Sequence, residues 1–297
     1  MIIKNIIRAL RLPFTSASAL PFIFGSLIPR ENFNFLGFIL GFIAAVSAHL
    51  SANLINDYAD SRSGADWQDK KFYEFFGGSK LIQEKVFSEK FYLKLSILFG
   101  AISLVCVASL ALILKSPLPI GLYLVIIFLG WSYSTKPLQL SYHRLGELII
   151  FLLFGPALVM GGYFIQTGIF PDLKSFVLSL PFGFLTTTIL FVNEIPDYPQ
   201  DHKAGKFTWV SITGQKKAFI IYYFLVFSAF ISIAISGKLG YLNKFSYLSF
   251  ILILLSLKTI NILEKYYDDK MRLIESSKLT IMLQAFVGII LIISLIL

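Results

Sequence analysis

Acidic and amide side chains gather at the end of a long apolar run that begins near Phe35. The stretch reads Asn53-Leu-Ile-Asn56-Asp57-Tyr-Ala-Asp60. At about 100° of rotation per residue, Asn53, Asp57 and Asp60 fall within about a 60° sector of one helix face, and Asn56 lies beside them. Acids at the end of a membrane-length segment are costly unless they are paired, hydrated or bound to a cation. Two carboxylates and two amide oxygens on one face predict a site for a hard divalent cation, with a solvated, cap-rich helix end as the alternative.

A second acidic cluster follows a later apolar run and repeats the Asn-x-x-x-Asp spacing of the first. Here Asn193 and Asp197 are followed one turn later by Asp201. Pro196 and Pro199 are expected to break or kink the helix, which would place the last acid on an unwound segment. Two such clusters on one side of a membrane are hard to explain as solvated helix ends alone.

Composition places the chain in a membrane. Of its 297 residues, 56% are hydrophobic and 14% are charged, and the mean hydropathy is +0.76, far above that of a soluble domain. Since a helix needs about 20 apolar residues to cross a bilayer, we predict an all-α integral membrane protein with nine transmembrane helices, in one transmembrane domain over residues 1–297. The predicted spans are 11–29, 35–56, 91–114, 117–135, 145–167, 174–194, 217–236, 244–263 and 278–297.

Lysine and arginine set the predicted orientation, because cytoplasmic loops of membrane proteins are enriched in them. With nine spans, one set of alternate loops carries only Arg30, Lys115, Lys174, Lys238 and Lys244. The other set and the N-terminus hold the remaining basic residues, so we expect a cytoplasmic N-terminus and a C-terminus on the opposite side of the cell (inner) membrane. The net charge of +9 therefore calls for no nucleic acid partner, and it favours contact with anionic lipids of the bilayer.

The longest predicted loop, residues 61–90, contains Gly77-Gly78-Ser79. A glycine pair permits positive φ angles and lets the backbone approach an anion closely, although an ordinary flexible turn has the same composition. A loop of this length is more often a functional lid than a simple connection. The single cysteine, Cys106, excludes an internal disulfide and any cysteine-based metal site.

Basic residues accompany the acidic clusters on the predicted cytoplasmic side. They are Lys80, Lys136, Arg144, Lys203 and Lys206. Mg²⁺ favours a few carboxylates together with the oxygens of a substrate diphosphate, and basic side chains neutralise the remaining charge. The abundant Phe and Tyr would line a cavity for a long apolar tail and stabilise a carbocation through their ring faces. The residues thus indicate a lipid diphosphate that is ionised at the membrane surface, although short basic loops also follow from orientation alone.

These motifs resemble those of the UbiA superfamily of intramembrane prenyltransferases, in Asn56-Asp57-x-x-Asp60, Asp197-x-x-x-Asp201 and the number of spans. Within that superfamily, the Gly64-x-Asp66 continuation and the Gly77-Gly78-Ser79 stretch are most similar to the menaquinone-pathway branch, the 1,4-dihydroxy-2-naphthoate polyprenyltransferases. The first motif of the superfamily often has an acid four residues after Asp60, where this chain has Gly64. The role of Asp66 is therefore left open.

The resemblance implies nine helices around a central cavity and transfer of a polyprenyl chain from its diphosphate to an aromatic acceptor, with Mg²⁺ as cofactor. In the menaquinone branch it also implies loss of the ring carboxylate as CO₂. Four carboxylates are implied to act in catalysis and to bind the metal: Asp57, Asp60, Asp197 and Asp201. The amides implied to complete the metal sites are Asn53, Asn56 and Asn193. The basic side chains implied to bind the diphosphate are Arg62, Lys136, Arg144 and Lys206. Arg11 and Tyr133 are implied to lie beside the acceptor.

Other functions share part of this pattern. The same superfamily includes enzymes that act on 4-hydroxybenzoate, a chlorophyll precursor, haem or a lipid alcohol. A cation-coupled transporter would also need acids in a membrane, but transporter sites lie near the bilayer midplane rather than at one face. A phosphatidyltransferase is not supported, since the chain has no Asp-Gly-x-x-Ala-Arg segment. No feature of the sequence defines the oligomeric state or the prenyl chain length.

Overall fold

The computed structural model describes residues 2–29, 31, 33–67 and 69–297, and these residues are built from helices without a β-strand. In chain order the helices are α1 (Ile2–Ala9), η1 (Leu12–Phe14), α2 (Ser16–Leu27), α3 (Phe35–Ser63), η2 (Ala65–Trp67), α4 (Glu89–Ile113), α5 (Leu118–Ser132), η3 (Leu140–Tyr142), α6 (Gly146–Leu152), η4 (Leu153–Ala157), α7 (Leu158–Thr167), α8 (Leu173–Lys203), α9 (Val210–Thr213), η5 (Gln215–Lys217), α10 (Ala218–Lys238), η6 (Lys244–Leu252), α11 (Ile253–Lys265) and α12 (Lys270–Ile296). The predicted all-α fold is confirmed.

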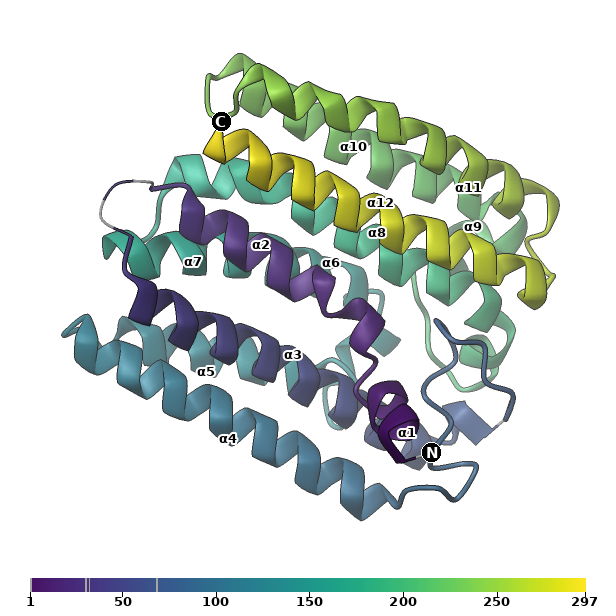
Figure 1. The fold of residues 1–297 in the computed structure, drawn as a ribbon. Coiled ribbons are helices and arrows are strands. Elements are labelled where there is room, and N and C mark those ends of the chain that lie inside the picture. The colour runs from purple at the N-terminus through teal and green to yellow at the C-terminus, as the bar shows by residue number, and fades with distance from the viewer. Residues whose placement is uncertain (1, 30, 32, 68) are drawn as a thin grey trace.

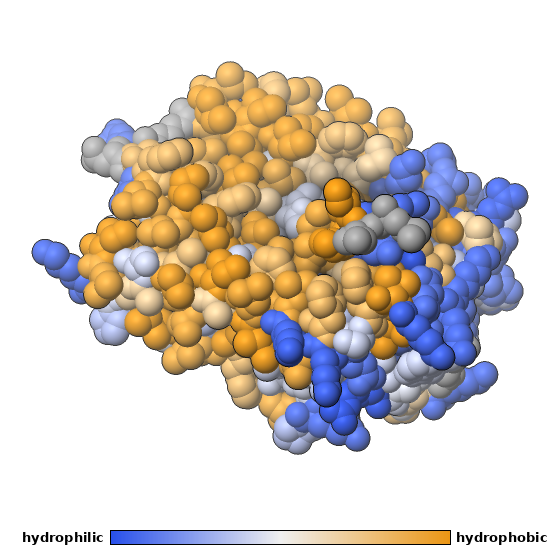
Figure 2. Space-filling view, turned by 60° about the horizontal axis from the view of Figure 1, so that its bottom comes forward, coloured by the Kyte–Doolittle hydropathy of each residue, from blue (hydrophilic) through white to orange (hydrophobic). Residues whose placement is uncertain are grey.

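Seven helical segments of the described chain are long and apolar enough to cross a membrane. Two shorter apolar helices, Leu12–Leu27 and Leu118–Ser132, coincide with the remaining predicted spans, so the count of nine crossings stays a prediction. The long helices run side by side, with α1 and the C-terminal end of α12 at opposite ends of the bundle (Figure 1). Figure 2 shows a broad hydrophobic surface with hydrophilic residues collected mainly at one end, as expected for a multi-pass membrane protein.

Three helices extend beyond the predicted spans, and each extension carries polar residues to the same end of the bundle. The α3 helix continues to Ser63, so its acids remain helical. The α12 helix begins at Lys270 rather than at residue 278, because the Asp269 side chain accepts hydrogen bonds from the N–H groups of Met271 and Arg272. The α8 helix continues to Lys203.

The continuity of α8 corrects the prediction that its prolines break it and leave Asp201 on an unwound segment. Both prolines lie inside the helix, and Asp201 is helical. Because Pro199 has no N–H, it cannot bond the carbonyl of Ile195 four residues earlier. The Gln215 side chain donates to that carbonyl instead, at 2.7 Å. A side chain from the following segment thus replaces the missing helical hydrogen bond.

Glycines bring α2 and α7 into close contact on one side of the bundle. A Cβ atom added at Gly25 would lie 2.1 Å from the carbonyl oxygen of Val159, and one added at Gly162 would lie 2.6 Å from that of Phe22. Small residues of this kind allow membrane helices to approach backbone to backbone. The largest buried core is formed by α8 with α10, α11 and α12, and it includes Phe182, Tyr222 and Leu283.

Candidate active site

The acidic ends of α3 and α8 face one cavity of about 180 Å³. From α3 the lining includes Asn53, Asn56 and Asp60. From α8 it includes Asn193, Asp197 and Asp201. The structure therefore brings together the two clusters that were predicted from their spacing. Asp57, the remaining candidate ligand, is buried beside this cavity at 2% exposure.

Asp57 and Asp60 are held by different partners. Asp57 forms an ion pair with Arg11, and its other oxygen accepts the N–H of Ser79 at 3.2 Å. Arg11 itself lines the cavity, in left-handed backbone conformation with φ of 51°. Asp60 accepts hydrogen bonds from the Tyr142 hydroxyl at 3.2 Å and from the Asn56 amide at 3.1 Å. These contacts fix both carboxylates at the cavity end of α3.

Near the end of α8, Asp201 forms an ion pair at 3.2 Å with the ammonium group of Lys206, which lies just beyond the helix. Burial alone would lower the pKa of Lys206, but the charges of Asp201 and Asp60 raise it well above its ordinary value, so this lysine stays cationic. The Asn193 side-chain oxygen is buried and accepts no hydrogen bond from the described residues. It is therefore available to a ligand or a cation.

The loop between α3 and α4 forms one wall of the cavity. Gly77, at φ of 74°, donates its N–H to Asp197 at 2.8 Å. Gly78, at φ of 77°, lies so close to Asp66 that an added Cβ would be 2.7 Å from a carboxylate oxygen. The glycine pair thus brings backbone against anions, as predicted, and the anions it meets here are carboxylates of the protein.

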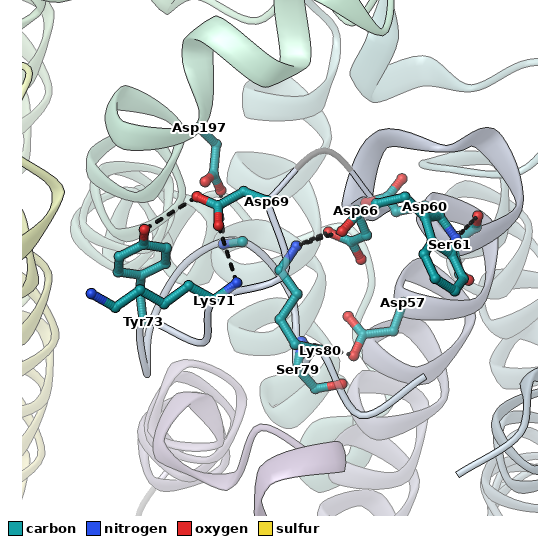
Figure 3. Close-up of polar contacts among 12 residues, drawn as sticks. Asp57, Asp60, Ser61, Asp66, Asp69, Lys71, Tyr73, Ser79, Lys80 and Asp197 are labelled. Atoms are coloured by element: carbon teal, nitrogen blue, oxygen red, sulfur yellow. Dashed lines mark hydrogen bonds and ion pairs between the residues drawn. The ribbon is translucent and has the colours of Figure 1, made fainter. Parts of the chain in front are cut away.

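Asp66 and Asp69 anchor the same loop (Figure 3). Lys80 donates to the Asp66 carboxylate at 2.9 Å. Burial, opposed by the Lys80 charge, raises the pKa of Asp66 to about 7. Lys270 of α12 pairs with Asp69 at 2.7 Å, so the start of α12 is tied to the loop. The role left open for Asp66 is, in this structure, that of an anchor for Lys80.

The predicted diphosphate ligands are only partly gathered. Lys206 lines the cavity, whereas Arg62, Lys136 and Arg144 are exposed and lie outside its lining. Arg62 follows Asp57 by five residues, which turns it about 140° away on the helix, and it bonds the Tyr58 hydroxyl. Arg144 bonds Ser211 instead. The geometry gives these three residues no place at the diphosphate.

Sequence reasoning missed part of the cationic lining. Lys270 lines the cavity because α12 begins at this residue, before the predicted span, and nothing local in the sequence indicates that early start. Lys80 was noted only as a basic residue on the correct side, and it lines the cavity as well. Both residues predicted beside the acceptor, Arg11 and Tyr133, line the cavity.

A second, apolar chamber of about 360 Å³ adjoins the first. Its walls come from α2, α3, α4, α5 and the η4–α7 segment, and they include Phe22, Leu110 and Ile127. His49 and Phe154 line both spaces. Their rings meet edge to face at 4.8 Å between centroids, and His49 also bonds the Ser18 hydroxyl at 2.9 Å. A polar cavity therefore meets an apolar chamber at this aromatic pair.

The donor set of the polar cavity fits Mg²⁺ in kind, because its ligand atoms are carboxylate and amide oxygens. The unpartnered Asn193 oxygen is a donor of this type. Among the described residues, no three His, Cys, Asp or Glu side chains converge on one point.

Residues 18–282 match the model of the UbiA prenyltransferase family. The chain is 30% identical over 191 residues to UbiA prenyltransferase domain-containing protein 1 of Dictyostelium discoideum, covering 64% of this chain and 57% of that protein. It is 29% identical over 229 residues to the human protein of the same name, covering 74% of this chain and 64% of that protein. The chain thus matches about three fifths of their length, and these names do not single out the menaquinone-pathway branch.

Solved structures share the fold. A UbiA homologue from Aeropyrum pernix K1 superposes with a TM-score of 0.73 at 17% identity, covering 94% of this chain and 97% of that one. A UbiA homologue from Archaeoglobus fulgidus, bound to DMAPP and Mg²⁺, gives 0.64 at 18% identity, covering 95% and 98%. At these identities the likeness concerns the arrangement of the helices.

Proposed function

The chain belongs to the UbiA prenyltransferase family, and we propose that it transfers a polyprenyl chain from polyprenyl diphosphate to a hydroxylated aromatic acceptor. One observation carries the proposal: a cavity lined by carboxylates and cations shares His49 and Phe154 with an apolar chamber. A substrate with a charged head and a long hydrocarbon tail matches both halves of this space. The family of the chain supports the same substrate class.

The polar cavity would hold the diphosphate with Mg²⁺. Asp60, Asp197 and Asp201 are the lining carboxylates that would bind the metal, with Asn53, Asn56 and Asn193 as amide ligands and Asp57 beside them. When bound, Mg²⁺ neutralises the charge that develops on the departing diphosphate. Lys206, Lys80, Lys270 and Arg11 line the same cavity and would add to this neutralisation. We assign no such role to Arg62, Lys136 or Arg144.

The apolar chamber would hold the prenyl tail. Its lining is almost entirely hydrocarbon and aromatic, and only a few hydroxyl groups and His49 interrupt it. Burying hydrocarbon contributes about 0.8 kcal/mol per CH₂ group, so each added isoprene unit would favour binding. The same walls keep water from the allylic cation, which otherwise would be hydrolysed.

The acceptor would react at the junction of the two spaces. The carbon–oxygen bond to the diphosphate breaks, the prenyl carbon joins a ring carbon, and the ring then loses a proton or its carboxylate as CO₂. On the motif resemblance we take 1,4-dihydroxy-2-naphthoate, with decarboxylation in menaquinone biosynthesis, as the acceptor to test first. Arg11 and Tyr133 line the cavity where the acceptor would lie. We place the site on the cytoplasmic side of the cell (inner) membrane, by the distribution of basic residues.

The test uses purified protein in detergent with Mg²⁺, a polyprenyl diphosphate and either 1,4-dihydroxy-2-naphthoate or 4-hydroxybenzoate, with products identified by mass. A prenylated product that has lost CO₂ from the naphthoate is the expected result. A product only with 4-hydroxybenzoate would reassign the acceptor, and no product with any hydroxylated ring would overturn the proposed reaction. Tyr133→Phe and Arg11→Lys are expected to raise the KM for the acceptor.

A further inference from the structure

Glu194 is a cavity residue to which the proposed chemistry gives no role. It follows Asn193 on α8, is 4% exposed and lines the polar cavity. Among the described residues, no N–H or O–H group donates to either of its carboxylate oxygens. A buried carboxyl group without a donor is costly unless a ligand supplies one. The residue thus calls for a hydrogen-bond donor from within the cavity.

Glu147 of α6 is a second buried carboxyl group near Glu194 and does not line the cavity. Glu147 is completely buried, and one of its oxygens accepts the backbone N–H of Trp209. The second Glu147 oxygen, like both oxygens of Glu194, has no hydrogen-bond partner among the described residues. Glu194 lines the cavity and Glu147 does not, so Glu194 is the member of the pair that a ligand in the cavity would meet.

On α8, Glu194 lies on the membrane-interior side of Asp197 and directly follows Asn193, the innermost proposed metal ligand of this helix. It precedes Asp197 by three residues, which places it about 4.5 Å further along the helix axis toward the membrane interior. On that side the lining becomes apolar, with Ile150, Ile189 and Leu190. A flat ring would therefore have hydrocarbon walls on its faces and Glu194 at one polar edge.

We propose that Glu194 recognises the aromatic acceptor by accepting a hydrogen bond from one of its ring hydroxyl groups. This inference rests on the proposed function and defines the acceptor class further, as rings with a free hydroxyl at that edge. Such a residue sets specificity, because a site built to bond a hydroxyl rejects an analogue that lacks it.

The test compares three acceptors, the dihydroxynaphthoate and its two monomethyl ethers, each of which has one of the two ring hydroxyl groups methylated. The wild-type protein is expected to prefer the free hydroxyl at one position by on the order of tenfold to a hundredfold in kcat/KM, the range expected when a buried polar group loses its hydrogen-bond partner. Glu194→Leu is expected to bring that ratio close to one. Glu194→Gln, which keeps shape and a neutral acceptor oxygen, is expected to lower it several-fold.

Thr188→Val is the matched control on the same helix. Thr188 is buried, bonds the carbonyl of Phe184 within α8 and does not line the cavity, so the variant is expected to keep the wild-type ratio. Wild-type discrimination in both Glu194 variants would overturn the inference. A change in Mg²⁺ activation in place of a changed ratio would also overturn it, by assigning Glu194 to the metal. A wild-type protein that prenylates no ring would instead overturn the proposed function itself.

Discussion

The Asp197 carboxylate accepts the backbone N–H of Gly77 at 2.8 Å, and this contact joins α8 to the loop that follows α3. The next residue, Gly78, lies against Asp66, which in turn binds Lys80. One short stretch of backbone therefore positions a proposed metal ligand and a cation of the cavity at once. The loop acts as a wall of the site.

Gly78→Ala is expected to disturb this wall. Alanine at a positive φ costs about 1–2 kcal/mol, and the new Cβ would also meet the Asp66 carboxylate at 2.7 Å. We expect the KM for the prenyl diphosphate to rise on the order of tenfold, equivalent to about 1.4 kcal/mol. Gly64→Ala is the control, since Gly64 also has positive φ but nothing within 4 Å of an added Cβ. Equal KM values in the two variants would contradict the role of the Asp66 contact.

Gln215→Met is expected to destabilise α8 by leaving the Ile195 carbonyl without its donor. The expected cost is about 1–3 kcal/mol, that of an unsatisfied buried carbonyl, measured as thermal or denaturant unfolding in detergent. Pro199→Ala restores an N–H that can bond the same carbonyl within the helix. The cost of Gln215→Met should therefore shrink in the Pro199→Ala background. An identical cost in both backgrounds would show that Gln215 stabilises the protein in another way.

Asp66 is expected to make stability depend on pH in the absence of metal. The ordinary pKa of an aspartate is about 4. In the folded protein, burial raises the pKa of Asp66 to about 7, although the charge of Lys80 opposes this shift. The folded state then holds a proton that the unfolded chain has released, so this contribution is present at low pH and is lost as pH rises from about 4 to about 7. Asp66→Asn should remove that part of the pH dependence of unfolding.

Asp69 provides a control, because its pKa is shifted in the opposite direction from that of Asp66. Burial alone would raise its pKa, but hydrogen bonds from Lys270, the Lys71 N–H and Tyr73 lower it. Its stabilising contribution is therefore present above its ordinary pKa and lost as pH falls. Asp69→Asn should leave the loss between about pH 4 and about pH 7 unchanged. If the stability of Asp66→Asn depended on pH as that of the wild-type protein does, Asp66 would not be the group responsible for the loss of stability between about pH 4 and about pH 7.

The apolar chamber is expected to limit the length of the prenyl donor. Gly130 of α5 lines it, and an added Cβ there meets only Ala52 at an ordinary 3.7 Å, so Gly130→Phe should fold and fill part of the space. We expect kcat/KM for long donors to fall on the order of tenfold or more, as a few buried CH₂ contacts at about 0.8 kcal/mol each are lost. For dimethylallyl diphosphate, which has one isoprene unit, kcat/KM of the variant should equal that of the wild-type protein.

Gly121→Phe is the control on the same helix. Gly121 does not line the chamber, and nothing lies within 4 Å of an added Cβ. Both variants remove a helical glycine, so differences in helix propensity cancel. Equal kcat/KM values for long donors in the two variants would show that the prenyl tail does not bind in the apolar chamber.

Periodicity predicted which polar side chains of one helix would face the same space, because the angle between side chains on a helix follows from their spacing. Asn53 and Asp60 share a cavity for this reason, and so do Asn193 and Asp197. The same spacing rule places Arg62 on a different face of α3 from the acids, which argues against Arg62 as a diphosphate ligand. Its assignment came from family resemblance and position in the chain, and the geometry does not support it.

Contacts between segments that are far apart in the sequence could not be predicted from the local sequence pattern. Lys270 reaches the cavity because α12 starts early, and α8 passes through Pro199 because Gln215 supplies a donor from the following segment. Glu194 lies between Asn193 and Asp197 in the sequence, but only the structure shows that it is buried, faces the cavity and lacks a donor among the described residues. Each of these depends on packing between segments that no single helix encodes.

The most direct test of the central claim measures Mg²⁺-dependent release of diphosphate from a labelled polyprenyl diphosphate. Asp60→Asn and Asp197→Asn change one carboxylate on each side of the cavity, and Asp268→Asn changes an exposed aspartate away from it. Each cavity variant is predicted to lose at least about a hundredfold in rate, a typical cost of removing transition-state charge stabilisation, while Asp268→Asn keeps the wild-type rate. Wild-type release by either cavity variant, or release that needs no divalent cation, would contradict the claim that α3 and α8 act together on one diphosphate.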